Sequence, residues 1–138
     1  MSWKSTSRFK DTIRQLTRRN KPGRYAEIIA RLNLTLTGWI NYYRYLRSDY
    51  QLKQLDSWIR RKLRVIKLKQ LKNRYTVARF YMRNGVAEYQ AWIGVLSGIG
   101  YWRRSAIPQS HQAMNVQWFR EQGLVSMSQR WKELQSKP

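Results

Sequence analysis

The chain of 138 residues contains no cysteine and a single histidine, His111. Disulfide bonds and thiolate metal sites are therefore excluded, and one imidazole cannot build a histidine-rich metal centre. The sequence also lacks an apolar run of the roughly 18 residues that span a bilayer, and its N-terminal segment lacks the apolar core of a signal peptide. We therefore expect an intracellular, cytoplasmic protein.

Acidic residues are scarce, with 7 Asp and Glu against 28 Lys and Arg, so the formal net charge is +21. The acids are scattered, and no two are adjacent. Hard cations such as Mg²⁺ require clustered oxygen ligands, so the sequence predicts no metal site. Positive charge on this scale repels itself in a compact fold, and a bound polyanion relieves that repulsion.

The few residues with chemical potential do not indicate catalysis. His111 follows Ser110, but adjacent side chains of a helix point about 100° apart and cannot easily share a proton. Asp49 and Asp56 are better interpreted as charge-balancing or capping residues than as metal ligands. We expect no catalytic residue, no cofactor and no enzymatic activity of the chain itself.

Hydrophobic residues make up 42% of the chain, which includes seven Trp and nine Tyr. This content excludes a disordered basic tail, and apolar residues recur every three or four positions, which indicates amphipathic helices. The sequence predicts a compact all-α fold of about six to seven helices. The expected helices include 8–19, a new helix capped by Asn33, and a continuous helix over 108–122.

Two further features concern segmentation of the chain. The pair Asn84-Gly85 is typical of a left-handed helix C-terminus, and the density of basic residues drops after it. We therefore expect a helical domain over 1–84 and a C-terminal helical extension over 85–138, packed on it and able to contact nucleic acid. The segment 97–104 is rich in glycine and aromatic residues and is predicted to be an ordered loop or a short extended segment.

Cations concentrate between Gln51 and Asn84, where Asp56 is the only acid. Four of them form a stripe beside the apolar face of a predicted helix: Lys53, Arg60, Arg64 and Lys67. A merely solvated helix face normally mixes both signs of charge, so we interpret the stripe as an exposed surface for phosphates. Nearby cations extend it, namely Arg61, Lys69, Lys72 and Arg74.

Two more groups complete the predicted RNA-binding residues. Basic side chains flank the first interhelical turn, at Arg18, Arg19, Lys21 and Arg24. Tyr101 and Trp102 lie beside Arg103 and Arg104, and exposed aromatic and arginine side chains stack on unpaired bases. The other aromatic residues at helical spacing are predicted to pack in the core, namely Trp39, Tyr43, Trp58, Trp92 and Trp118.

Two linked motifs carry a family resemblance. The segment 28–44 contains Leu32-Asn33 followed by Gly38-Trp39-Ile40-Asn41-Tyr42-Tyr43, and a later segment reads Leu55-Asp56-Ser57-Trp58-Ile59-Arg60-Arg61-Lys62-Leu63-Arg64. Both resemble the group II intron maturase-specific domain, also called domain X or the thumb. The strings Gly100-Tyr101-Trp102-Arg103 and Trp118 to Ser126 are similar to the tail of bacterial group II intron reverse transcriptases. The family commonly has proline where this chain has Leu34.

The resemblance implies a thumb-like helical bundle with a smaller C-terminal helical part. In the family, this region binds intron RNA, assists its folding and splicing, and grips the template–primer duplex. The implied partners are structured intron RNA, the rest of the reverse transcriptase, and template–primer or target DNA. The RNA-directed DNA polymerase of the family holds Mg²⁺ through a motif that this sequence lacks, so the resemblance implies a non-catalytic C-terminal part of such an enzyme.

Other functional classes remain as alternatives. The strongest is a DNA-binding module of a mobile-element protein, because the C-terminal parts of these intron proteins also contact target DNA. A nuclease or complete polymerase is disfavoured by the scattered acids. An amphipathic protein of the membrane surface fits the charge but not the Gly38-to-Tyr43 motif.

Overall fold

The computed structural model describes residues 3–18, 23–46 and 48–136, with side chains from Thr6 onward. These residues form nine α-helices and no β-strand, which confirms the all-α prediction. The helices are α1 (Trp3–Leu16), α2 (Tyr25–Tyr43), α3 (Tyr50–Leu71), α4 (Arg74–Arg83), α5 (Glu88–Leu96), α6 (Tyr101–Arg104), α7 (Pro108–Ala113), α8 (Val116–Glu121) and α9 (Met127–Ser136). Among them, no helix is both long enough and apolar enough to span a membrane.

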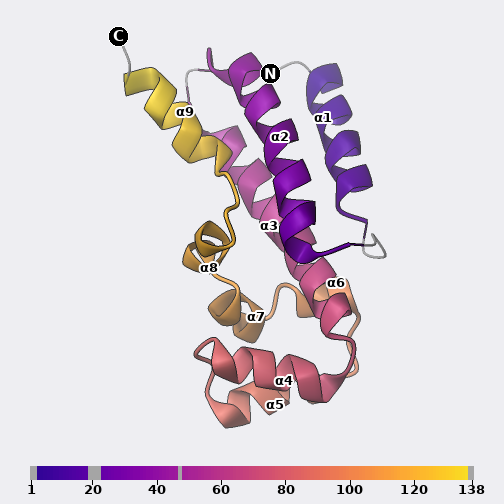
Figure 1. Cartoon of the computed structure of the whole chain (residues 1–138). Coiled ribbons are helices and arrows are strands. Elements are labelled where there is room, and N and C mark those ends of the chain that lie inside the picture. Colours follow the sequence, from indigo (N-terminus) through magenta and orange to yellow (C-terminus); the bar gives the residue numbers. More distant parts are fainter. Residues whose placement is uncertain (1–2, 19–22, 47, 137–138) are drawn as a thin grey trace.

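Helices α1, α2 and α3 run side by side, and α3 extends beyond them to carry α4 and α5 at its far end (Figure 1). The chain then returns along α3 through α6, α7 and α8, and α9 packs against α2 and α3. The long helix α3 therefore contacts both the N-terminal helices and the C-terminal segment. The boundary at residue 84 stays a prediction, although residues on either side of it are in contact.

The core follows the apolar spacing of the sequence. Phe9 and Ile13 of α1 and Leu36 of α2 are fully buried, and so are the α3 residues Leu52 and Leu63. These side chains recur every three or four positions, so each helix buries one face. Full burial of such a side chain contributes roughly 1.5–3 kcal/mol.

Aromatic residues close the end of this core near the N-terminus of α1. The ring of Phe9 meets Trp39 edge-on with centroids 5.4 Å apart, and Trp39 stacks on Tyr43 at 5.7 Å. Tyr43 is buried, whereas Trp39, Trp58, Trp92 and Trp118 are half-buried and pack against the core. The predicted packing of these aromatic residues is confirmed.

Asn33 does not begin a new helix as predicted, because α2 continues through it without interruption. Its side chain instead bridges to the C-terminal segment, where Nδ2 donates to Gly123 O at 2.7 Å and Oδ1 accepts from Val125 N at 2.9 Å. A tertiary partner for each amide atom removes the tendency of asparagine to end helices locally. Gly38 of the same helix is not required by close packing, since a Cβ there would meet nothing within 4 Å.

The predicted helix over 108–122 is two helices, α7 and α8, separated at Met114 and Asn115. Asn115 Oδ1 accepts a hydrogen bond from Trp118 N at 2.8 Å, so its side chain caps α8 and favours the break. Residues 101–104 form the short helix α6 rather than a loop. Gly85 does end α4 with a φ of 98°, as predicted.

Asp56 of α3 holds the start of α9. Its carboxylate is 5% exposed and accepts hydrogen bonds from Met127 N at 2.9 Å, Ser128 N at 3.0 Å and Ser126 Oγ at 3.0 Å. A carboxylate at a helix N-terminus satisfies free N–H groups and complements the helix dipole. Asp56 therefore caps a helix, but one that begins about 70 residues later in sequence rather than a local one.

Candidate nucleic-acid interface

Arg64, expected at the centre of an exposed stripe, is buried. Its side chain is 5% exposed, Nε donates to Met114 O at 2.9 Å, and the guanidinium lies 5.4 Å from the Phe119 ring. Burial, assisted by the like charge of Arg60, lowers the pKa of Arg64 to about 10. Arg64 is therefore a cation at neutral pH that holds the turn between α7 and α8, and its expected exposure is wrong.

The remaining residues of the stripe are not a continuous exposed surface either. Lys67 is half-buried, with Nζ 5.0 Å from the Tyr25 ring and 5.6 Å from the Phe80 ring. Burial and the nearby Arg83 lower the pKa of Lys67. Lys53 is exposed and lies 3.5 Å from Asp49 Oδ2. The middle of the stripe is thus a packing surface, because the segment after Ser105 covers Arg64, and Tyr25 and Phe80 flank Lys67.

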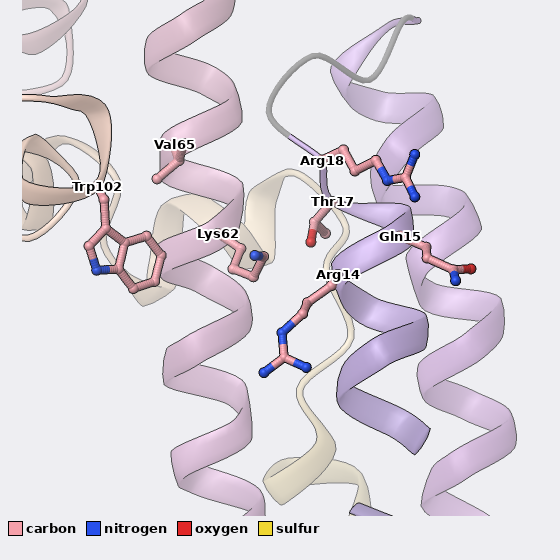
Figure 2. A pocket seen from close by; sticks show the side chains of 7 residues that line it. All are labelled: Arg14, Gln15, Thr17, Arg18, Lys62, Val65 and Trp102. Atoms are coloured by element: carbon pink, nitrogen blue, oxygen red, sulfur yellow. The ribbon is translucent and has the colours of Figure 1, made fainter. Parts of the chain in front are cut away.

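An open basic groove lies instead between α1 and α3, with Trp102 of α6 at its border. This α1–α3 groove has a volume of about 400 Å³ and is lined by Arg14, Gln15, Thr17, Arg18, Lys62, Val65 and Trp102. Figure 2 shows Lys62 between Trp102 and Arg14, whereas the guanidinium of Arg18 points away from Trp102. No acidic residue is among the described residues that line the groove.

Three cations surround the indole of Trp58 next to this groove. The distances to the ring centroid are 5.6 Å from Lys10 Nζ, 5.6 Å from Arg14 Cζ and 5.5 Å from Lys62 Nζ. The negative face of an indole attracts cations, although the three positive charges repel one another. Asp11 lies 2.8 Å from Arg14 Nη1 and offsets part of this charge.

Trp102 is fixed on α3 by Arg61. The guanidinium lies 3.8 Å from the centroid of the indole, Nη2 donates to Trp102 O at 2.9 Å, and Nε donates to Ser105 Oγ at 3.2 Å. The indole nevertheless remains 38% exposed. Trp102 therefore presents an ordered aromatic surface to solvent, as the sequence predicts for a base-stacking residue.

A second cavity of about 520 Å³ lies on the other side of Trp102. Its charged and aromatic lining comprises Trp58, Arg60, Arg61, Arg64, Trp102 and His111. Burial, together with the positive charges of Arg64, Arg61 and Arg60, lowers the pKa of His111. This cavity, like the α1–α3 groove, presents cations and indole rings to solvent.

A third cleft, of about 840 Å³, brings together predicted residues that are distant in sequence. Lys72 and Arg74, at the turn between α3 and α4, face Tyr101 and Arg104 of α6 across it. Arg104 Nη2 also donates to Ser97 O at 2.8 Å, so this guanidinium partly serves the local fold. The cleft is a second place where phosphate and base contacts are compatible with the side chains present.

The other predicted residues that the structure describes do not line these hollows. Arg24 and Arg103 are exposed and Lys69 is partly exposed, whereas Arg19 and Lys21 fall outside the described residues. Sequence reasoning omitted Lys10, Arg14 and Lys62 from the site, and Trp58, which packs against the core as predicted, also lines the second cavity. Lys10, Arg14 and Arg18 recur every four residues, which is the signal that could have identified the α1 side of the groove.

No group of three or more His, Asp or Glu side chains suited to a metal ion occurs within residues 3–18, 23–46 and 48–136. The family description "Group II intron, maturase-specific domain" matches residues 6–83, which is more than half of the chain. The comparison with curated proteins gave no match. The matched segment contains α1 from Thr6 onward, α2, α3 and α4, and therefore all residues that line the α1–α3 groove except Trp102.

Proposed function

Because the chain belongs to the family of the group II intron maturase-specific domain, we propose that it binds structured intron RNA and assists the folding and splicing of that RNA. The maturase-specific domain is not itself a polymerase domain, and the proposed role is binding without a reaction or cofactor of its own. The rest of a reverse transcriptase is the proposed protein partner, and template–primer duplex is a further proposed ligand.

The observation that supports RNA binding best is the α1–α3 groove. It combines Arg14 and Lys62 with the indole of Trp102, Lys10 and Trp58 adjoin it, and no acidic residue is among its described lining residues. Lys and Arg neutralise phosphates and release counterions, while exposed aromatic rings contact bases. A net charge of +21 adds long-range attraction for any polyanion.

Salt dependence tests this electrostatic mode of binding. A site that neutralises about six phosphates should lose roughly a thousandfold in affinity for a folded group II intron RNA between 50 and 200 mM salt. The measurement is a series of dissociation constants at increasing salt concentration. An affinity that does not change with salt would contradict the proposal.

Single substitutions locate the interface. Arg14→Ala and Lys62→Ala should each weaken RNA binding and lower the slope of log affinity against log salt by about one. Arg31→Ala is the matched control, because Arg31 is exposed on α2 and lines none of the hollows described above. An equal loss of affinity in all three variants would mean that the total charge, and not this groove, determines binding.

Competition distinguishes RNA from DNA as the ligand. Folded intron RNA should displace a labelled RNA probe at a lower concentration than duplex DNA with the same number of phosphates. The reverse order would favour a DNA-binding module.

A further inference from the structure

We infer that the indole of Trp102 is a stacking surface for an unpaired nucleobase, with Lys62 and Arg14 placed to bind the adjoining phosphates. The inference rests on the proposed function and deepens it, because it specifies which class of RNA element the site recognises. It predicts a bulge, loop or single-stranded end rather than a continuous duplex.

The first argument is the rigidity of the indole. Arg61 covers one part of the ring at 3.8 Å and also donates to the carbonyl oxygen of Trp102 at 2.9 Å. Ser105 Oγ accepts from Arg61 Nε and donates to the same carbonyl. An aromatic side chain ordered before binding loses less conformational entropy when a ligand stacks on it.

The second argument is the free space around the ring. Trp102 lines the α1–α3 groove of about 400 Å³ and the neighbouring cavity of about 520 Å³. Both volumes fall in the roughly 300–1,000 Å³ range of small-ligand sites. Arg61 lines the cavity but not the groove. Because Trp102 is 38% exposed, a planar group that enters the groove can reach the part of the ring that Arg61 leaves uncovered.

The third argument is the chemistry around these hollows. Lys62 and Arg14 lie on the groove side of the indole (Figure 2), and Arg60 lines the cavity, while no carboxylate occurs among the described lining residues of either. An aromatic surface beside cations fits a base together with its phosphates. In an A-form duplex, neighbouring bases already cover each base face, so only an unpaired base is free to stack on Trp102.

The test uses three RNA hairpins of identical stem sequence. One carries a single bulged adenosine, one carries an abasic ribose at the same position, and one is fully paired. The wild-type chain should bind the bulged hairpin more tightly than either of the others. Trp102→Ala should lower the affinity for the bulged hairpin by about tenfold, while the other two hairpins change little. The slope of log affinity against log salt should be the same for Trp102→Ala as for the wild-type chain, because stacking releases no counterions.

Matched variants separate stacking from loss of apolar bulk. Trp102→Phe keeps an aromatic ring and should retain part of the preference for the bulge, whereas Trp102→Leu keeps apolar bulk and should lose it. Tyr45→Ala removes another exposed aromatic residue that has an arginine above its ring, at 4.8 Å from Arg44, and should leave the preference intact.

The outcomes are distinct for the two proposals. If the chain binds all three hairpins equally and Trp102→Ala changes none of them selectively, base stacking is wrong while RNA binding stands. If the wild-type chain binds none of the hairpins, nor the folded intron RNA, at low salt, both proposals are overturned.

Discussion

The two edges of α3 carry similar cations in different environments. On the closed edge, Arg64 donates to a backbone carbonyl of the returning C-terminal segment, and Lys67 lies against the rings of Tyr25 and Phe80. On the open edge, Lys62 lines the groove between α3 and α1 and lies 5.5 Å from the Trp58 ring. On the same helix, Arg64 therefore holds another part of the chain, whereas Lys62 lines an open groove.

What separates the edges is the segment that lies over each of them. Residues 105–128 contact the closed edge through Ser105, Met114 and Met127, whereas α1 flanks the open edge and leaves a groove. A buried cation costs free energy unless a polar partner compensates it, and Met114 O supplies that partner. Charge on a helix thus indicates phosphate binding only where no other part of the chain covers it.

The largest effect on stability is expected at Asp56. Asp56→Ala removes three hydrogen bonds to the start of α9 and leaves buried N–H groups without partners. We expect the free energy of unfolding to fall by about 3 kcal/mol, measured by urea denaturation. Asp11→Ala is the control with the same change of charge, because Asp11 makes only an exposed ion pair and should cost less than about 1 kcal/mol. Equal midpoints for the two variants would show that Asp56 does not hold the C-terminal segment.

A pair of substitutions tests the contrast between the edges directly. Arg64→Ala should lower the free energy of unfolding by about 2 kcal/mol, because it removes a charged hydrogen bond and leaves Met114 O unpaired. Lys62→Ala should change stability by less than about 0.5 kcal/mol but weaken RNA binding. Denaturation and RNA titration of both variants give the comparison. If Lys62→Ala destabilises as much as Arg64→Ala, the two edges do not differ as described.

The helices of the core could be predicted because their signal is local. The spacing of Leu52, Ile59 and Leu63 fixes which face of α3 is buried, and Gly85 ends α4 at a φ that other residues rarely adopt. Asn33 could not be predicted in this way, because its partners Gly123 and Val125 are distant in sequence and override local preference. The break within 108–122 has a local signal in the Asn115 cap, and the distant contact between Met114 and Arg64 adds to it.

The types of residue in the candidate site could be predicted from the sequence, but their positions in the fold could not. Trp102 beside basic residues indicated a stacking residue, and the structure places it next to Arg61 in an exposed position. Arg64 could not be recognised as buried, because the carbonyl that pairs with it belongs to Met114, 50 residues later. Lys10 and Lys62 approach the indole of Trp58 from separate helices, and only the packing of α1 on α3 brings them together.

The smallest expected effect is a pH dependence at the closed edge, reported by the only histidine of the chain. Burial and the charges of Arg64, Arg61 and Arg60 lower the pKa of His111 below its ordinary value of 6.5. His111 therefore binds a proton more readily in the unfolded chain than in the folded chain. The contribution of the neutral imidazole to stability is complete above pH 6.5 and is lost as the pH falls through the pKa of His111 in the folded state. The effect should be small because His111 is largely exposed.

RNA binding should move this pKa in the opposite direction. Phosphates near Arg60 and Arg61 would offset the charges that disfavour protonation of His111, so its pKa should rise in the complex. NMR titration of the one imidazole measures both states without assignment ambiguity, and His111→Gln supplies the blank. A pKa of His111 at or above 6.5 in the free protein would mean that the nearby arginines do not disfavour its protonation. A pKa that stays low in the RNA complex would place the bound phosphates elsewhere, most directly along the α1–α3 groove alone.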